Sequence, residues 1–309
     1  MVEIQNIAVI GAGLMGHGLA QIFASNGYPV RLMDIEQERL DKAIENIRSN
    51  LILMAERGIG QSEEIEPAIA KVETTTDLKQ AAAGAHFVVE AVLENLELKQ
   101  DIFKDLDRIC SGETILATNT SVISITEIAQ KAKERGRILG THFWNPPYLI
   151  PLVEVIRGED TSEEAMEVTY ALMKGVGKHP VRVNKDVPGF VGNRLQHALW
   201  REAISIVERG IADAATVDEC IRFGFGLRLP MLGPLETADM VGTDLTLAIH
   251  NYILKYIESS PGPSPLLKKK VEEGDLGFKS GRGFQEWTPE EAQKSRKRLQ
   301  EYLLKVTKG

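Results

Sequence analysis

Several polar side chains that can transfer a proton or donate a hydrogen bond stand where predicted strands end. Asn119 and Ser121 follow one short apolar run, and His142 follows the next one along the chain. Glu154 is a single carboxylate inside a third apolar run, and Asn193 opens a helical pattern. Because open α/β sheets bind their ligands at the carboxyl ends of strands, we expect these five residues to contribute to one site.

His142 and Glu154 are candidates for a proton-transferring pair. Histidine has an unperturbed pKa of about 6.5, which suits the reversible removal of a hydroxyl proton at neutral pH. A carboxylate on the other ring nitrogen would fix the tautomer and stabilise the imidazolium. The alternatives are a structural hydrogen bond for His142 and a surface-facing position on an edge strand for Glu154.

A glycine-rich turn near the N-terminus predicts a dinucleotide cofactor. Gly11, Gly13 and Gly16 follow a short apolar run and open a helix. Gly11 permits the tight turn, Gly13 lets the backbone approach a pyrophosphate, and Gly16 lets the helix pack closely on the strand. Asp34 ends the next strand, where its carboxylate can accept hydrogen bonds from ribose hydroxyls and would repel a 2′-phosphate. The predicted cofactor is therefore NAD, and a glycine-rich turn of some other α/β protein is the alternative.

The elements that must position these residues alternate between strand and helix. This alternation predicts an α/β fold with an N-terminal Rossmann-type, mostly parallel and doubly wound sheet. An amphipathic pattern over residues 40–54 and a second helix over residues 62–72 predict an inserted helical hairpin. Strands are expected at residues 7–10, 30–34, 87–90, 115–118 and 138–141.

The pattern changes near residue 185, because no convincing strand follows Pro188. We predict that residues 1–185 form the NAD-binding Rossmann domain with its helical hairpin. Residues 186–309 then form a C-terminal all-α domain for substrate binding and dimerisation. The largely apolar helices of this domain could pair with those of a second copy, so a homodimer is expected.

Composition excludes several classes of protein. The 309 residues are 26% charged and 43% hydrophobic, which allows two globular domains. The net charge of −8 includes no long basic cluster, so no nucleic acid is expected as a partner. No apolar run approaches the roughly 18 residues of a membrane span, and a strand begins too early for a signal peptide. Cys110 and Cys220 suggest neither a disulfide framework nor a metal site, so we expect a cytoplasmic protein without metal.

The chain as a whole resembles the 3-hydroxyacyl-CoA dehydrogenase family. The resemblance is carried by eight short motifs that occur in the family's order over essentially the whole chain, which is far more specific than any single motif. They occupy residues 11–16, 89–99, 119–121, 142–146, 152–156, 188–194, 233–239 and 281–284.

The resemblance implies roles for the matching positions. His142 would be the general acid and base and Glu154 its orienting partner, while Ser121 and Asn193 would hold the substrate oxygen. Hydroxyl and amide groups suit that role because they can polarise a carbonyl that gains negative charge during hydride transfer. The residues implied or predicted to bind NAD are Gly11, Gly13, Leu14, Met15, Gly16, Asp34, Glu94, Lys99, Asn119, Ser121 and Asn145.

Some positions depart from the pattern of family members that act on coenzyme A thioesters. Such members typically carry a lysine just before the strand of the catalytic glutamate, and Pro151 stands at that position here. They also carry basic residues in the helical hairpin, whereas this chain has Glu56 beside Arg57. Arg228 lies in a loop that is longer than in many of these enzymes, where it could bind a free carboxylate or be an ordinary surface arginine. Residues 145–154 and 233–237 resemble the branch that contains L-gulonate 3-dehydrogenase and lambda-crystallin.

These observations predict an NAD-dependent oxidoreductase that interconverts a 3-hydroxyacyl and a 3-ketoacyl group. A short-chain L-3-hydroxyacyl-CoA such as 3-hydroxybutyryl-CoA is the first expectation. A free 3-hydroxy acid such as L-gulonate, or carnitine, is the alternative. A non-catalytic, crystallin-like protein that binds NAD is a further alternative, against which the retention of Ser121, His142, Glu154 and Asn193 argues.

Overall fold

The computed structural model describes residues 3–307, which form two compact units. The first unit contains the chain up to Arg194 together with the last residues from Leu299 onward. The second unit contains Leu195–Arg298.

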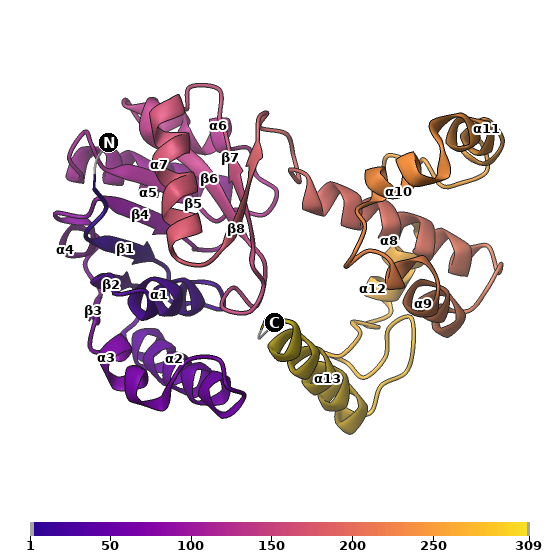
Figure 1. Cartoon of the computed structure of the whole chain (residues 1–309), viewed down its shortest axis with the longest axis horizontal. Coiled ribbons are helices and arrows are strands. Elements are labelled where there is room, and N and C mark those ends of the chain that lie inside the picture. Colours follow the sequence, from indigo (N-terminus) through magenta and orange to yellow (C-terminus); the bar gives the residue numbers. More distant parts are fainter. Residues whose placement is uncertain (1–2, 308–309) are drawn as a thin grey trace. The chain divides into compact units, whose positions relative to one another are not determined.

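An eight-stranded sheet forms the middle of the first unit (Figure 1). Its strand order is β3-β2-β1-β4-β5-β6-β7-β8, and the first six of these strands in that order are parallel. β7 runs antiparallel to β6, and β8 is parallel to β7. The predicted doubly wound, mostly parallel sheet is thus confirmed. The strands are β1 (Ile7–Ile10), β2 (Val30–Met33), β3 (Val72–Thr75), β4 (Phe87–Glu90), β5 (Ile115–Thr118), β6 (Ile138–Phe143), β7 (Leu152–Ile156) and β8 (His179–Val183).

Two strands differ from the sequence-based expectation. The helix expected to continue to Val72 ends earlier, and Val72–Thr75 is an edge strand of which only Thr75 is buried. So short and exposed an edge strand lacks the continuous apolar run that marks the central strands. β6 extends to Phe143, so His142 lies within the strand and not after it.

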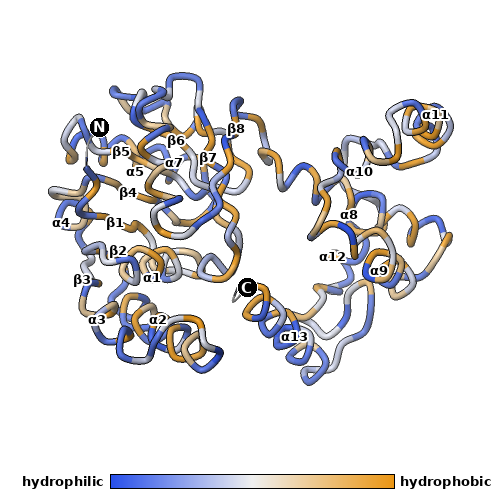
Figure 2. Tube along the Cα trace, viewed as in Figure 1, coloured by the Kyte–Doolittle hydropathy of each residue, from blue (hydrophilic) through white to orange (hydrophobic). Residues whose placement is uncertain are grey.

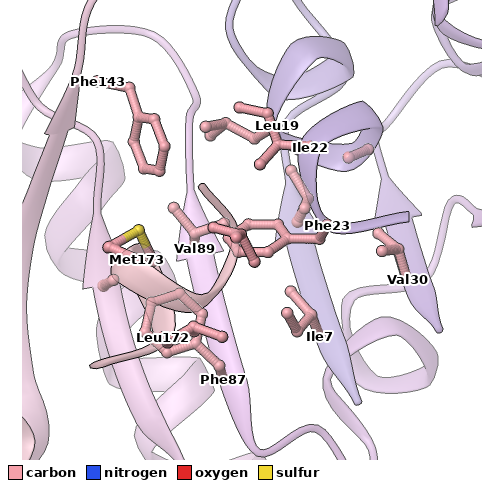
Figure 3. Packing of buried hydrophobic residues seen from close by; sticks show 14 of the residues in the cluster. Ile7, Leu19, Ile22, Phe23, Val30, Phe87, Val89, Phe143, Leu172 and Met173 are labelled. Carbon is pink, nitrogen blue, oxygen red and sulfur yellow. The ribbon is translucent and has the colours of Figure 1, made fainter. Parts of the chain in front are cut away.

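Helices cover both faces of the sheet, and alternate residues of each strand point to opposite faces. One apolar cluster joins Ile7 and Val9 of β1 to side chains of α1, including Phe23 (Figure 3). A second cluster joins Ala8 and Ile10 to α4, α5 and α6. Strands buried on both faces account for the apolar runs of the sequence, which Figure 2 shows as hydrophobic segments. The helices are α1 (Gly16–Ser25), α2 (Gln37–Glu56), η1 (Ser62–Glu64), α3 (Ile65–Ile69), α4 (Leu78–Ala82), α5 (Leu96–Ile109), α6 (Ile125–Ile128), η2 (Ala129–Lys131), η3 (Arg135–Arg137) and α7 (Glu163–Gly175).

The second unit is helical, as predicted for the C-terminal part of the chain. Within Leu195–Arg298 the structure contains no strand, and only isolated bridges join Arg282 to Gly277 and Glu286. The elements are α8 (Gly192–Glu208), which begins in the first unit, α9 (Ala214–Phe223), η4 (Phe225–Leu227), α10 (Pro234–Val241), α11 (Thr243–Ile253), α12 (Pro265–Glu272) and α13 (Pro289–Thr307), which ends in the first unit. Among residues 3–307 there is no helix with the length and apolarity needed to cross a membrane.

The turn between β1 and α1 should tolerate a methyl group at one glycine and reject it at another. A Cβ atom at Gly16 would lie 1.7 Å from the carbonyl oxygen of Gly11, whereas a Cβ at Gly13 would meet no atom within 4 Å. We predict that Gly16→Ala lowers the free energy of unfolding by about 3 kcal/mol or more, because the backbone must shift. Gly13→Ala is the control and should unfold near the wild-type temperature. Thermal unfolding followed by circular dichroism measures both, and equal midpoints for wild type and Gly16→Ala would contradict the prediction.

Candidate active site

The glycine-rich turn lies where the strand order reverses, between β1 and β4, which is where open α/β sheets bind nucleotides. Gly11 has a φ of 102°, and a Cβ there would lie 2.7 Å from the carbonyl oxygen of Ala91. Gly11 and Gly16 are therefore required by close backbone contacts, while Gly13 and Leu14 are exposed. No side chain caps the first turn of α1, and the positive end of the helix dipole there suits an anionic ligand.

Asp34 follows β2, and its carboxylate is hydrogen-bonded to the glycine-rich turn. Its Oδ2 accepts a hydrogen bond from the backbone N–H of Ala12 at 2.8 Å, and the residue is buried. Ile35, the next residue, is exposed. The Asp34 carboxylate and the apolar Ile35 side chain therefore lie beside the glycine-rich turn. Met15, at the end of this turn, is half-buried. A carboxylate and free N–H groups in this arrangement fit the ribose and pyrophosphate of NAD.

A fully buried ion pair lies at the carboxyl ends of β4 and β5. The Lys99 ammonium donates to Glu90 Oε1 at 2.7 Å, and Thr118 donates to Glu90 Oε2 at 2.7 Å. Lys99 also lies 3.4 Å from a carboxylate oxygen of Glu94. Lys99 has no exposed surface, so the structure places it beneath the site as a support for these two carboxylates.

Glu94 holds the turn that carries Ser121. Its Oε1 accepts hydrogen bonds from the Thr120 hydroxyl at 2.6 Å and from the N–H groups of Ser121 and Val122 at 2.9 and 3.1 Å. Burial acts to raise the pKa of the Glu94 carboxyl, yet these hydrogen bonds and the charge of Lys99 together lower it below its ordinary value. Glu94 is thus ionised at neutral pH, and it fixes the turn by accepting these three hydrogen bonds.

Two further residues are connected to this turn. Asn193 Nδ2 donates to the backbone carbonyl of Ser121 at 3.0 Å, and the Ser121 residue is exposed. Asn119 Oδ1 accepts from the Phe143 N–H at 2.9 Å, which ties the end of β5 to the end of β6. The structure therefore brings Ser121, Asn193 and Asn119 together.

His142 and Glu154 face each other directly across β6 and β7. They are partners in the antiparallel register, and residues opposite each other in such a ladder have side chains on the same face. His142 Nδ1 and Glu154 Oε2 are 2.7 Å apart, and both side chains are buried. β7 lies between β6 and β8, so Glu154 does not occupy the edge strand that was the alternative.

The protonation of this pair follows from the partners of Glu154. Its other oxygen, Oε1, accepts from the N–H groups of Val191 and Gly192 at 2.9 and 3.0 Å, at the start of α8. Burial acts to raise the pKa of the Glu154 carboxyl, but the hydrogen bonds from His142, Gly192 and Val191 together lower it. An ionised carboxylate only accepts, so Nδ1 of His142 carries the proton of this hydrogen bond, and Nε2 is the ring nitrogen left to act on a substrate.

Aromatic rings enclose the imidazole. The ring centroids of Trp144 and Phe190 lie 5.3 and 5.7 Å from that of His142. A Cβ at Gly192 would lie 2.5 Å from Trp144 Cζ2, so glycine allows the indole to pack against the start of α8. Sequence reasoning did not single out these neighbours or the N–H groups that bind Glu154. Gly192, one of two glycines in the 188–194 motif, is the signal that could have indicated this close approach.

Two further predicted residues, Asn145 and Arg228, are exposed. Asn145 is exposed in the loop that follows β6. Arg228 is exposed at the end of η4 in the second unit. The residues of the described chain include no group of three or more histidine, cysteine, aspartate or glutamate side chains that could hold a metal ion.

A Rossmann-type sheet, an open glycine-rich turn and a buried histidine–carboxylate pair together define an NAD-dependent oxidoreductase. The family model described as "3-hydroxyacyl-CoA dehydrogenase, NAD binding domain" matches residues 6–187. The model described as "3-hydroxyacyl-CoA dehydrogenase, C-terminal domain" matches residues 189–287. The chain belongs to the 3-hydroxyacyl-CoA dehydrogenase family, and its cofactor is NAD.

Individual relatives resemble the chain over nearly its whole length. A probable 3-hydroxybutyryl-CoA dehydrogenase of Bacillus subtilis is 42% identical over 286 residues, which cover 92% of this chain and 98% of the relative. A 5-formyl-3-hydroxy-2-methylpyridine 4-carboxylate 5-dehydrogenase of Mesorhizobium japonicum is 34% identical and covers 93% and 92% of the two chains. A solved structure of an enzyme of this second name, described as an NAD+-dependent dismutase, is 33% identical with a TM-score of 0.91 and covers 98% of this chain and 97% of that chain.

The ionised state of Glu154 predicts how stability depends on pH. Because its pKa is lower in the folded chain than the ordinary value of 4.5, its contribution is present above pH 4.5 and is lost as the pH falls through the folded pKa. Glu154→Gln should therefore cost about 1–3 kcal/mol at pH 7, and the difference from wild type should shrink below pH 4.5.

Thermal unfolding of both proteins between pH 7 and pH 3 measures this effect. Glu159→Gln, at an exposed position shortly after β7, is the matched control and should behave as wild type. A difference between wild type and Glu154→Gln that is the same at pH 7 and pH 3 would contradict the assignment of an ionised carboxylate.

Proposed function

We propose that this protein interconverts a short-chain L-3-hydroxyacyl-CoA, such as 3-hydroxybutyryl-CoA, and the corresponding 3-ketoacyl-CoA. The observation that carries the proposal is the buried His142–Glu154 pair, at the positions where the resemblance to the family implies the general acid and base and its partner. The substrate class is supported by relatives that are named 3-hydroxybutyryl-CoA dehydrogenase, at 42%, 41% and 38% identity.

In the proposed reaction, Nε2 of His142 accepts the proton of the substrate's 3-hydroxyl group while the hydrogen on C3 leaves as hydride. The bound NAD+ supplies the acceptor for that hydride. Glu154 accepts from Nδ1–H, so it fixes the tautomer in which Nε2 is the acceptor and stabilises the imidazolium that forms. In the reverse direction the imidazolium returns the proton to the ketone oxygen.

Ser121 and Asn193 are the proposed partners of the substrate oxygen. Ser121 lies in the turn after β5, and Asn193 lies in the first turn of α8. The hydrogen bond from Asn193 Nδ2 to the Ser121 carbonyl connects them. A hydroxyl and an amide that are already held in place can stabilise an oxygen as it gains negative charge. Lys99 is buried, so its proposed part in cofactor binding is to orient Glu94. Asn145, which is exposed, would contact the nicotinamide end of bound NAD.

Replacement of His142 tests the proposal. We expect His142→Ala to lower kcat by about 10²- to 10⁴-fold, the usual contribution of a positioned acid and base. The dissociation constant of NADH, measured by its fluorescence, should hardly change, because the histidine acts on the substrate oxygen.

The assay should use a panel of L-3-hydroxyacyl-CoA thioesters of increasing chain length together with free 3-hydroxy acids. Turnover by the wild type should be greatest for the short thioesters. Wild-type rates in His142→Ala would refute the mechanism, and turnover confined to free acids would refute the proposed substrate.

A free hydroxy or aldehyde acid is a second candidate substrate. One observation that favours it is the solved structure with a TM-score of 0.91, whose name is that of an enzyme for a free pyridine carboxylate. A second observation concerns the cations that would bind a CoA phosphate. Pro151 offers none, and Arg57 already lies 3.8 Å from a carboxylate oxygen of Glu301. In this alternative Arg228 binds the substrate carboxylate through its forked guanidinium.

The second candidate makes its own prediction. If Arg228 binds a free carboxylate, Arg228→Met should raise KM for a free 3-hydroxy acid by about 10- to 100-fold, which matches the roughly 1.5–3 kcal/mol of a hydrogen bond to a charged group. The KM for a CoA thioester is measured in parallel as the control. Unchanged kinetics with the free acid would exclude this role for Arg228.

We also propose that residues 186–309 form the substrate and dimerisation domain of a cytoplasmic homodimer. The dimer is supported by exposed large apolar side chains along α10 and α11, including Leu235, Leu245 and Leu247. The location is supported by Cys110 and Cys220, which are both free thiols. Sedimentation of the full chain at micromolar concentration tests the dimer, and a monomer there would contradict it.

A further inference from the structure

Lys178 is a half-buried cation that the proposed reaction does not use. It lies in the turn between α7 and β8. Its Nζ donates to the backbone carbonyl oxygens of Pro147 and Ile150, at 2.5 and 3.1 Å. No carboxylate of the described residues forms an ion pair with it, in contrast to Lys99.

The two carbonyls belong to the segment of residues 144–151, which joins β6 to β7 and is called here the β6–β7 loop. This loop connects the strand of His142 to the strand of Glu154, and it carries Asn145. The loop also packs on the cofactor helix, because a Cβ at Gly18 of α1 would lie 2.5 Å from Pro147 Cγ. Any movement of the loop would therefore be transmitted to α1 and to Asn145.

We propose that Lys178 is a positioning residue whose ammonium clamps the β6–β7 loop and thereby sets Asn145 against the cofactor. This proposal rests on the proposed role of Asn145 at the nicotinamide end. Two carbonyl oxygens of one loop converge on one ammonium, so the clamp holds both ends of the 147–150 turn with charge-assisted hydrogen bonds.

The energetics argue that Lys178 is not present to stabilise the fold. Burial lowers the pKa of Lys178 from 10.5 to about 8. Since the unfolded chain then binds this proton more tightly than the folded chain does, the buried charge costs folding free energy at neutral pH, and the cost disappears as the pH rises from about 8 to 10.5.

The titratable side chains beside Lys178 are Tyr148 of the loop, Lys174 of α7 and His179 of β8, and none of them is bonded to the Lys178 ammonium. Burial raises the pKa of Tyr148, so its hydroxyl stays neutral in this range. Loss of the Lys178 proton should therefore be the event that weakens the clamp.

The test measures NADH binding by fluorescence at pH 7 and pH 9. In the wild type we expect the dissociation constant to rise about 3- to 10-fold between these values. Lys178→Arg, which stays charged, should bind NADH near the wild-type affinity at pH 7 and should lose this rise. Lys178→Met should bind about 10-fold more weakly already at pH 7. Lys174→Met, on the exposed side of α7, is the matched control.

Circular dichroism shows whether each variant folds. If Lys178→Met does not fold, the pH dependence of Lys178→Arg decides the question. A wild-type affinity that is constant from pH 7 to pH 9, or a Lys178→Arg affinity that still falls as in the wild type, would overturn the proposal. NADH binding does not depend on the acyl substrate, so a failure to turn over CoA thioesters would leave this result standing.

Discussion

A buried carboxylate at Glu154 connects three parts of the chain that are far apart in sequence. It accepts hydrogen bonds from His142 on β6 and from the N–H groups of Val191 and Gly192 at the start of α8. An ionised group in the interior is tolerated only when its oxygens are satisfied, so β6, β7 and the start of α8 must keep their relative positions. The orientation of the imidazole, and with it the chemistry of the site, depends on this one group.

Glu94 does for the substrate-facing turn what Glu154 does for the histidine. It accepts three hydrogen bonds from residues 120–122, and Lys99 stands behind it with Glu90. Removing one member of this network would leave a buried charge without its ion-pair or hydrogen-bond partner, which is costly in the interior. Glu154 thus holds the histidine, and Glu94 holds the turn that carries Ser121, although neither carboxylate transfers the proton itself.

Lys99 and the half-buried Lys178 show two ways of binding a cation that is withdrawn from solvent. Lys99 is fully enclosed and paired with carboxylates, so its charge is compensated. The Lys178 ammonium is bonded to two carbonyl oxygens, and burial lowers its pKa to about 8. The first arrangement gives a rigid support beneath the cofactor site, whereas the second gives a clamp whose strength changes with pH.

The sequence by itself determined the local elements of this protein and the kinds of residue that do its chemistry. Apolar runs marked the central strands, and the spacing of Gly11, Gly13 and Gly16 marked the nucleotide turn, because these signals need only neighbours along the chain. His142 and Glu154 stood out as polar residues at apolar strands. Only the tertiary structure decided that they face each other, since the antiparallel register of β6 and β7 is set by long-range pairing. The same holds for the edge strand β3, for the N–H groups of α8 that bind Glu154 and for the carbonyls that bind Lys178. Those contacts join segments distant in sequence, and no periodicity or spacing records them.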